Sequence, residues 1–421
     1  MTLSLSPRDE ALLAGELGPA ARLAMSILVR MARVYDAQAM LDITGAHVDS
    51  TIYVGDAGLE FAERLADLGA RVSVPTTLNV SGLDEHHWRE WTVPADWAEK
   101  AHRQMVAYQS MGTIPTWTCA PYQTEHAPKL GQQVAWGESN AIIYANSVLG
   151  ARTERYPDFL DICAAITGRV PAVGLHLDAN RVGQVVLDLS AVPREHAERD
   201  DFYPVLGYLM GRLAEDRIPV LAGLSATPSQ DQLKALGAAA ASSGSVGLFH
   251  LVGVTPEAPT LARALGGRAP EKTMRISMSE LRSAREALTT ATGEELDLVV
   301  LGSPHFSLDE LRRLAPLLEG KTCHPDITFL VTTSRMVSQL ARRAGLLESL
   351  GAFGGRVTVD TCILATPMLP KSVKRLMTSS GKYAFYSPGL LDVEVAFGSL
   401  EECVRSAVEG RVVRLPSPWD E

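Results

Sequence analysis

Two cysteines lie in polar segments where a thiol could bind a metal or act as a nucleophile. Cys119 follows a short run at 114–116, and Cys362 follows the β-branched run at 357–359, each with threonine, aspartate or proline nearby. Cysteine sulfur is a soft ligand suited to iron–sulfur clusters, and its thiolate form is a nucleophile. A free cysteine also serves as a small apolar core residue. The residues alone leave a ligand role and a core role equally open for both positions.

The other three cysteines have different surroundings. Cys163 and Cys403 lie at helical core spacing, which favours a packing role, because buried free cysteine behaves as a small hydrophobe. Cys323 precedes a strand predicted at 327–331 and should therefore lie at the opposite sheet edge from Cys362. Five cysteines, odd in number and widely spaced, do not have the pattern of a disulfide framework.

Polar segments follow several predicted strands directly. In the C-terminal part they are 302–305, 332–335 and 360–362, after strands predicted at 296–301, 327–331 and 357–359. In parallel α/β sheets, ligands bind beyond the carboxyl ends of the strands. We therefore expect these three segments to lie side by side. Further polar segments of this kind are 75–79, 117–122 and 138–140.

The elements that position these segments alternate between helices and strands. Apolar residues at helical spacing predict one long helix from Ser6 to about Asp36, and an amphipathic helix at 58–68 ends at Gly69. Strands are predicted at 40–44 and 71–75, and helices from Leu308 and Ser334 separate the C-terminal strands. Such alternation predicts an α/β fold with parallel sheets covered by helices.

The middle of the chain is less regular. Its predicted strands are 171–178, 185–189, 219–224 and 246–254, and its predicted helices are 203–214 and 229–241. Soft boundaries near Gly150 and Thr255 divide the chain into an N-terminal domain at 1–150, a middle domain at 151–255 and a C-terminal domain at 256–421. No linker rich in Pro, Gly and Ser separates them, so we expect three αβ domains that share a cleft.

Length and composition exclude several classes of protein. A chain of 421 residues is too long for one core, since cores stop growing near roughly 250–300 residues. The 39 basic and 49 acidic residues give a net charge of −10, which argues against nucleic acid as the main ligand. No segment supplies the roughly 20 apolar residues of a membrane span. The start of the chain lacks the pattern of a secretory signal, so we expect a cytoplasmic protein with no membrane partner.

Several ordered motifs together resemble the aconitase X family, a divergent branch of the aconitase superfamily. They are 54–59, 75–79, 138–140, 144–153, 174–178, 302–305 and 360–362, and the similarity extends through 379–388 and 397–403. The resemblance covers nearly the whole chain. It implies an aconitase-like fold of about three αβα domains with parallel or mixed sheets around a shared cleft. It also implies a small swivelling domain, which we expect to be absent from this chain and supplied as a separate subunit.

The resemblance implies an iron–sulfur cluster and assigns its ligands. The family's ligand positions fall on Cys119, Ser303 and Cys362. Many members have cysteine where this chain has Ser303, so the third ligand is either Ser303, through its oxygen, or Cys323 in its place. We expect a 2Fe–2S cluster, with 3Fe–4S and 4Fe–4S clusters left open.

The resemblance also implies which residues act on the substrate. Lys382 matches a substrate-binding lysine of the family, although most lysines are simply solvated at the surface. His305 is expected to orient the site rather than to bind metal. The implied catalytic residues are Lys382, Ser303 and His305. The implied substrate-binding residues are Gly45, Ala46, His47, Asn79, Glu138, Ser139 and Lys382, although Ala46 and His47 depart from the family's usual residues.

The expected activity is that of a hydro-lyase acting on a small β-hydroxy acid. The family's reactions make dehydration of cis-3-hydroxy-L-proline to pyrroline-2-carboxylate the first expectation, with a serine of the small subunit as the catalytic base. Dehydration of mevalonate 5-phosphate is the alternative, although no dedicated phosphate loop is visible. An alternative from another class is an inactive scaffold subunit without a cluster, suggested by Ser303.

Overall fold

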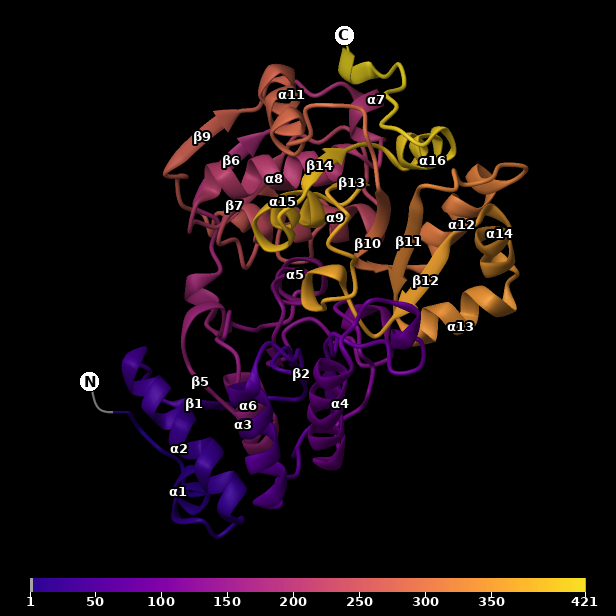
Figure 1. Ribbon diagram of the computed structural model, residues 1–421. Coiled ribbons are helices and arrows are strands. Elements are labelled where there is room, and N and C mark those ends of the chain that lie inside the picture. The colour runs from indigo at the N-terminus through magenta and orange to yellow at the C-terminus, as the bar shows by residue number, and fades with distance from the viewer. Residues whose placement is uncertain (1–2, 421) are drawn as a thin grey trace.

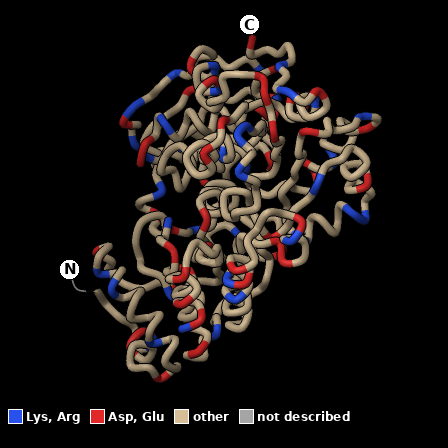
Figure 2. The backbone as a smooth tube through the Cα atoms, in the orientation of Figure 1, with Lys and Arg blue, Asp and Glu red and all other residues tan. Residues whose placement is uncertain are grey.

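The computed structural model describes residues 3–420, and within this range the strands form four sheets. Figure 1 shows the N-terminal helices at the bottom, β10–β12 with their helices at the right, and the middle of the chain at the upper left. Acidic and basic residues are interspersed along the chain (Figure 2). None of the described helices is long and apolar enough to cross a membrane.

The N-terminal part contains two small sheets. In one, β1 (Met40–Asp42) pairs antiparallel with β5 (Arg169–Pro171). In the other, β2 (Ala46–Val48) lies between β3 (Thr76–Leu78) and β4 (Ala135–Trp136), and both pairings are parallel. The helices here are α1 (Pro7–Ala14), α2 (Pro19–Val34), α3 (Asp56–Asp67), α4 (Ala95–Ser110), α5 (Ser139–Tyr144) and α6 (Leu160–Thr167).

The middle part is built on a four-stranded parallel sheet with the order β8-β7-β6-β9. Its strands are β6 (Val185–Asp188), β7 (Pro219–Ala222), β8 (His250–Leu251) and β9 (Lys272–Arg275). Its helices are α7 (Arg194–Ala197), α8 (Phe202–Ala214), α9 (Gln230–Ser243), α10 (Leu261–Ala264) and α11 (Met278–Ala287). Helices α8 and α9 pack against each other, and α9 also packs against α5 of the N-terminal part.

The C-terminal part is a five-stranded parallel sheet with the order β12-β11-β10-β13-β14. Its strands are β10 (Leu298–Phe306), β11 (Thr328–Thr333), β12 (Arg356–Val359), β13 (Arg375–Thr378) and β14 (Glu394–Phe397). Its helices are α12 (Leu308–Leu318), α13 (Arg335–Arg343), α14 (Leu346–Phe353), α15 (Gly381–Leu391) and α16 (Leu400–Glu409). The α/β fold with parallel sheets is confirmed.

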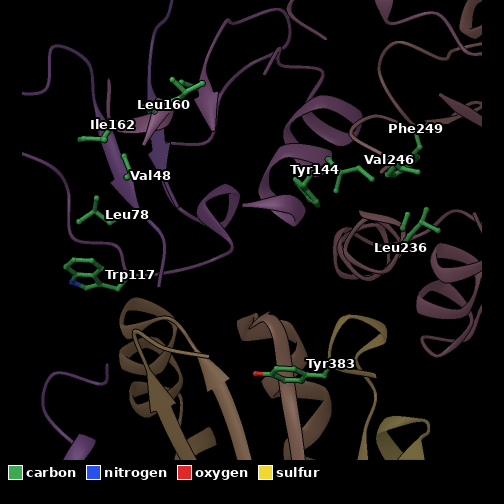
Figure 3. Packing of buried hydrophobic residues seen from close by; sticks show 14 of the residues in the cluster. Val48, Leu78, Trp117, Tyr144, Leu160, Ile162, Leu236, Val246, Phe249 and Tyr383 are labelled. Atoms are coloured by element: carbon green, nitrogen blue, oxygen red, sulfur yellow. The ribbon is translucent and has the colours of Figure 1, made fainter. Parts of the chain in front are cut away.

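The central strand β10 explains how this sheet joins the rest of the molecule. Leu298 and Val300 belong to the core cluster that extends through the N-terminal and middle parts, whereas Val299 and Leu301 belong to the C-terminal cluster. Successive side chains of a strand point to opposite faces, so both faces of the sheet are buried. Figure 3 shows Tyr383 of α15 close to these strands. The continuous apolar run at 298–301 therefore belongs to a strand that is covered on both faces of the sheet.

The opening helix differs from its prediction. The single helix predicted from Ser6 to about Asp36 is two helices, because the chain turns between them. Gly15 ends α1 with φ 87°, a left-handed conformation that favours glycine, and Pro19 starts α2 at a position where proline needs no hydrogen-bond partner.

Three predicted strands are also displaced or shortened. The strand predicted at 71–75 lies at Thr76–Leu78, and the one predicted at 171–178 ends at Pro171 and continues as two short 3₁₀ turns. The strand predicted at 246–254 is reduced to His250–Leu251, because the chain turns back at once: the N–H groups of Val254 and Thr255 both donate to Leu251 O at 3.0 Å.

The strand pairings divide the chain differently from the boundaries expected near Gly150 and Thr255. Strand β5 lies after Gly150 but pairs with β1, so it belongs to the N-terminal part. Strand β9 lies after Thr255 but pairs with β6, so it belongs to the middle sheet. Pairing between strands that lie far apart in the sequence has no local signal.

Candidate active site

The carboxyl ends of β10, β11 and β12 meet at one edge of the C-terminal sheet. Thr333 of β11 pairs with Phe306 on one side and with Val359 on the other. Arg335, just after β11, forms an ion pair with Asp360, just after β12. The segments 302–305, 332–335 and 360–362 therefore lie side by side, as their position after predicted parallel strands indicated.

Cys119 reaches this edge from the N-terminal part. Its segment runs parallel to β3, with Ile114 bridged to Thr77 and the Thr118 N–H donating to Leu78 O at 3.1 Å. The backbone N–H of His305 donates to Cys119 Sγ at 3.2 Å. This contact brings together the edges of the N-terminal and C-terminal sheets.

The imidazole of His305 connects the two cysteine-bearing loops. Its Nδ1 lies 3.0 Å from Thr118 Oγ1, and its Nε2 lies 2.9 Å from Thr361 O. A carbonyl oxygen only accepts, so the proton resides on Nε2 and the Thr118 hydroxyl donates to Nδ1. Burial lowers the pKa of His305 to about 4, which keeps the ring neutral. Both ring nitrogens are thus occupied, an arrangement that orients loops and leaves neither free for a metal.

The thiols of Cys119 and Cys362 lie near each other and near Lys382. Burial raises the pKa of Cys119 to about 12, with Glu138 and Cys362 adding to the rise and Lys382 opposing it. Burial also raises the pKa of Cys362, while hydrogen bonding to Tyr383 and Ser303 opposes the rise. The Cys362 thiol donates to the Tyr383 hydroxyl at 3.5 Å. Without a bound cation, both sulfurs are therefore protonated at neutral pH.

Ser303 lies between these cysteines and the start of α15. It is buried within β10, at the point where that strand departs from regular pairing with β11. The hydroxyl of Ser380, which caps α15, donates to the Ser303 carbonyl oxygen. Ser303 is therefore held by the N-cap residue of the helix whose first turn carries Lys382.

Lys382 is not a solvated surface lysine. Its side chain is 13% exposed and forms an ion pair with Glu138, whose side chain is 7% exposed. Its ammonium also donates to Ser139 Oγ at 3.4 Å. Glu138 precedes α5 and accepts from the Ala141 N–H at 2.8 Å, so that helix fixes the carboxylate.

The expected substrate-binding residues of β2 are not brought together at this site. Gly45 and Ala46 lie at the amino end of the strand, and Ala46 is part of the apolar core. His47 is buried beside Trp136, with Nδ1 2.8 Å from Thr77 Oγ1, and burial lowers its pKa to about 3. At about 3.3 Å per residue, Gly45 is separated from Val48, at the carboxyl end of the strand, by roughly 10 Å.

Asn79 and a residue that the sequence analysis missed, Asp49, do lie at the carboxyl edge. Asp49 follows β2 directly, and the Asn79 amide Nδ2 donates to its carboxylate. Burial raises the pKa of Asp49 to about 8, and the nearby carboxylates of Glu138, Asp158 and Asp161 contribute to the rise. The sequence around Asp49 has no clear signal, because in β2 only Val48 is β-branched.

The remaining cysteines lie away from the site. Cys163 of α6 and Cys403 of α16 are fully buried in the apolar core clusters. Cys323 precedes β11, and its thiol donates to Ile327 O at 3.5 Å. It therefore lies at the amino edge of the C-terminal sheet, opposite Cys362, as its position before the predicted strand suggested.

The donor set determines which cofactor fits. Among residues 3–420, no group of three or more His, Cys, Asp or Glu side chains could hold a metal ion. The donors that converge are two thiols, from Cys119 and Cys362, and the hydroxyl of Ser303. Soft sulfur ligands suit iron–sulfur clusters, and the ammonium of Lys382 favours thiolate over thiol. This set fits a cluster held by two thiolates and one serine oxygen.

Family models for aconitase X match almost the whole chain in three consecutive segments. The model of the first domain matches residues 2–179, that of the second domain 183–286, and that of the third domain 296–409. The strands that pair with each other, β1 with β5 and β6 with β9, lie within the same matched segments.

Curated relatives and a solved structure extend this comparison. Cis-3-hydroxy-L-proline dehydratase of Pseudomonas aeruginosa is 50% identical over 409 residues, which is 96% of this chain and 70% of that protein. The enzyme of the same name from Hypocrea jecorina is 47% identical, over 97% of this chain and 69% of that protein. The phosphomevalonate dehydratase large subunit of Methanothermobacter thermautotrophicus is 38% identical, over 95% of this chain and 98% of that protein.

The crystal structure of Thermococcus kodakaraensis aconitase X in its holo-form superimposes with a TM-score of 0.86 at 34% identity, covering 96% of this chain and 100% of that chain. Three matched domain models, relatives at up to 50% identity and this structural likeness agree, and the chain belongs to the aconitase X family.

Proposed function

We propose that this chain is the large, catalytic part of an iron–sulfur-dependent hydro-lyase that converts cis-3-hydroxy-L-proline to pyrroline-2-carboxylate. The observation that carries the proposal is the convergence of Cys119, Cys362 and Ser303 beside the buried ammonium of Lys382. The relatives named for this activity, at 50% and 47% identity, support the substrate.

Dehydration of a β-hydroxy acid has two chemical requirements. A base must remove the α-proton, and a Lewis acid must assist the hydroxyl, because hydroxide is a poor leaving group. In cis-3-hydroxy-L-proline the hydroxyl and the carboxylate share one ring face, so the α-hydrogen lies on the other. Elimination can therefore proceed with the base and the Lewis acid on opposite faces of the ring. The resulting enamine tautomerises to pyrroline-2-carboxylate.

Cys119, Cys362 and Ser303 would hold the cluster, which when bound supplies the Lewis acid for the hydroxyl group. The chain's own contribution is to keep the two sulfurs fixed and shielded. His305 connects the two loops through Thr118 and Thr361, and its backbone N–H donates to Cys119. A backbone N–H that donates to a sulfur ligand also influences the reduction potential of a cluster.

Lys382 would bind the substrate carboxylate. As the α-proton leaves, negative charge spreads into the carboxylate, and a fixed cation stabilises this charge better in a shielded site than in water. Glu138, already paired with Lys382, keeps the ammonium in position before substrate arrives. The two residues thus form a preorganised anion-binding element.

The base that removes the α-proton would come from a small partner subunit, as a serine. The relatives named as large subunits of phosphomevalonate dehydratase support such a partner, because the name implies a second, smaller subunit. They also make phosphomevalonate the second candidate substrate for this chain.

The test is anaerobic co-expression with the small-subunit reading frame, followed by iron and sulfide analysis and assays on both substrates. We expect a brown protein that turns over cis-3-hydroxy-L-proline and leaves mevalonate 5-phosphate unchanged. Preference for the phosphorylated substrate would reverse the order of the candidates. A colourless protein that takes up no iron on reconstitution would identify a scaffold subunit instead.

A further inference from the structure

Asp49 occupies the centre of the carboxyl edge of the N-terminal parallel sheet. It follows the central strand β2, while Asn79 follows β3 and Glu138 comes two residues after β4. The Asn79 N–H donates to Val48 O at 2.9 Å, and the Gly137 N–H donates to His47 O at 2.7 Å, so pairing continues to the ends of the strands. Three polar side chains therefore end three adjacent parallel strands, which is where α/β sheets bind ligands.

The backbone around Asp49 is held in place by buried side chains from other elements. Asp161 accepts from the Asp49 N–H at 2.6 Å and from the Ser50 N–H at 3.2 Å. Tyr108 and Gln104 of α4 both donate to Ser50 O, at 3.0 and 2.9 Å. Such support fixes the direction of the carboxylate and lowers the entropy lost when a ligand binds.

Asp49 lacks a cationic partner. Within residues 3–420, no lysine, arginine or histidine nitrogen lies within 4.0 Å of its carboxylate, although Lys382 pairs with the neighbouring Glu138. Asp158 and Asp161 add further negative charge around it. This part of the site favours a cation and disfavours a phosphate.

Asn79 provides a second, independent sign of a missing donor. Its side chain is almost completely buried, its Nδ2 donates to Asp49, and its Oδ1 has no hydrogen-bond partner. A buried acceptor left unpaired is costly and rare, so it indicates a group that a ligand completes. Asp49 and Asn79 together present two acceptors to one position.

We infer that Asp49 and Asn79 bind the ring ammonium of a cyclic secondary amino acid. A protonated ring nitrogen carries one positive charge and two N–H donors, which match one carboxylate and one amide oxygen. The substrate carboxylate would then face Lys382 at the neighbouring strand end. This inference rests on the proposed function and adds to it the group that distinguishes a proline derivative from a phosphorylated hydroxy acid.

The contact would also assist the reaction. A positive charge on the nitrogen beside the α-carbon stabilises the negative charge that develops there as the proton leaves. With the ammonium at Asp49 and the carboxylate at Lys382, two of the three heavy-atom substituents of the α-carbon are fixed, and the ring joins the third to the nitrogen, so the direction of the α-hydrogen is set. Orientation of this kind is a major part of enzymatic rate enhancement.

The experiment compares two ligands that differ in one ring atom. L-Proline and (S)-tetrahydrofuran-2-carboxylate have the same ring and carboxylate, but the second has an oxygen, which only accepts, in place of the ammonium. Their affinities are measured by calorimetry on the cluster-loaded chain with its small subunit, for the parent and for Asp49→Asn. Asp67→Asn, at an exposed position of α3, is the matched control.

We expect the parent and Asp67→Asn to prefer L-proline by about ten- to a hundredfold, as charged hydrogen bonds suggest. Asp49→Asn should reduce this preference below about threefold while its affinity for the oxygen analogue stays unchanged. An unchanged preference in Asp49→Asn overturns the inference. So does equal binding of both ligands by the parent, a result that does not depend on the variant's folding. Turnover of cis-3-hydroxy-L-proline by the same parent preparation tests the proposed function separately.

Discussion

The ammonium of Lys382 is ion-paired with the carboxylate of Glu138, although the two residues are 244 positions apart in the chain. Burial lowers the pKa of Lys382, but the charge of Glu138 and its hydrogen bond with the ammonium outweigh this effect and raise the pKa above its ordinary value. Lys382 is therefore a permanent cation at the junction of the first and third matched domains. An incoming carboxylate shares this cation with Glu138.

Replacing Lys382 by methionine should lower kcat by about two to three orders of magnitude, because a fixed charge that stabilises the developing anion is lost. A contact that strengthens toward the transition state acts through kcat rather than KM. Steady-state kinetics at matched iron content measure the effect, with Lys371→Met at an exposed position as control. Near-normal turnover in Lys382→Met would remove Lys382 from the mechanism.

Cys119→Ala and Cys362→Ala should each abolish bound iron while preserving the fold, since both lie at the sheet edges and neither is a buried member of a core cluster. Cys163→Ala and Cys403→Ala are matched controls, because both thiols are fully buried in apolar surroundings. These two should keep the cluster and lose about 1 kcal/mol of stability. Iron and sulfide analysis measures the cluster content of the four variants, and thermal melts measure their stability. Full iron in either of the first two variants removes that residue from the ligand set.

Ser303→Cys should increase the iron retained after purification, because it adds a third soft donor beside Cys362. Ser303→Ala should lower iron content, and Cys323→Ala should leave it unchanged, since Cys323 lies at the opposite sheet edge. The measurement is iron per chain after anaerobic gel filtration, with the charge-transfer absorption as a second readout. Loss of iron in Cys323→Ala would make Cys323 the third ligand.

The cysteine-bearing edge was predictable because it depends on local patterns. Apolar runs such as 298–301 lead into polar segments, and parallel strands place those segments together, so Ser303 and Cys362 could be assigned to one edge from the sequence. The prediction of one unbroken opening helix is wrong, because Gly15 ends α1 and Pro19 starts α2. Those residues were present in the sequence, but the apolar periodicity on both sides masked them.

Asp49 could not be predicted, because nothing local distinguishes it from a turn aspartate. Its position depends on β3 and β4 ending on either side of β2, and its direction depends on Asp161, 112 residues later. The proximity of Lys382 to Glu138 likewise depends on how two domains meet. Contacts of this kind arise from tertiary packing, which neither periodicity nor motif spacing encodes.

Lys234→Met should destabilise the protein by about 3–5 kcal/mol, because it leaves buried charges without a partner. The Lys234 side chain is 2% exposed and pairs with Asp231 at 3.1 Å and with Glu310. Its ammonium also donates to His305 O at 3.4 Å, which joins α9 to the cysteine-bearing edge. Denaturant unfolding measures the loss, and Lys371→Met should stay within about 0.5 kcal/mol of the parent. A similarly small change in Lys234→Met would show that the ion pairs of Lys234 contribute little to the free energy of unfolding.

Asp49→Asn should stabilise the ligand-free protein increasingly as the pH rises from about 4 to 8. The pKa of Asp49 is raised from 3.8 to about 8 in the folded state, by burial first and by Glu138, Asp158 and Asp161 next. Between these values the folded carboxyl keeps a proton that the unfolded chain has lost, so the parent's stability falls with rising pH.

A difference of one bound proton between the folded and unfolded states changes the free energy of unfolding by at most about 1.4 kcal/mol per pH unit. The asparagine variant lacks this pH dependence, because its side chain does not ionise. Asp161 and Asp360 also have raised pKa values, but they remain in both proteins, and to first order their contributions cancel in the difference. Urea unfolding of both proteins at half-unit steps from pH 4 to 9 gives this difference. It should rise through the window and level off above it, whereas a difference independent of pH would show that Asp49 ionises normally. A rising difference would mean that the fold maintains a carboxylate at the expense of its own stability, as expected for a group whose cation arrives with the substrate.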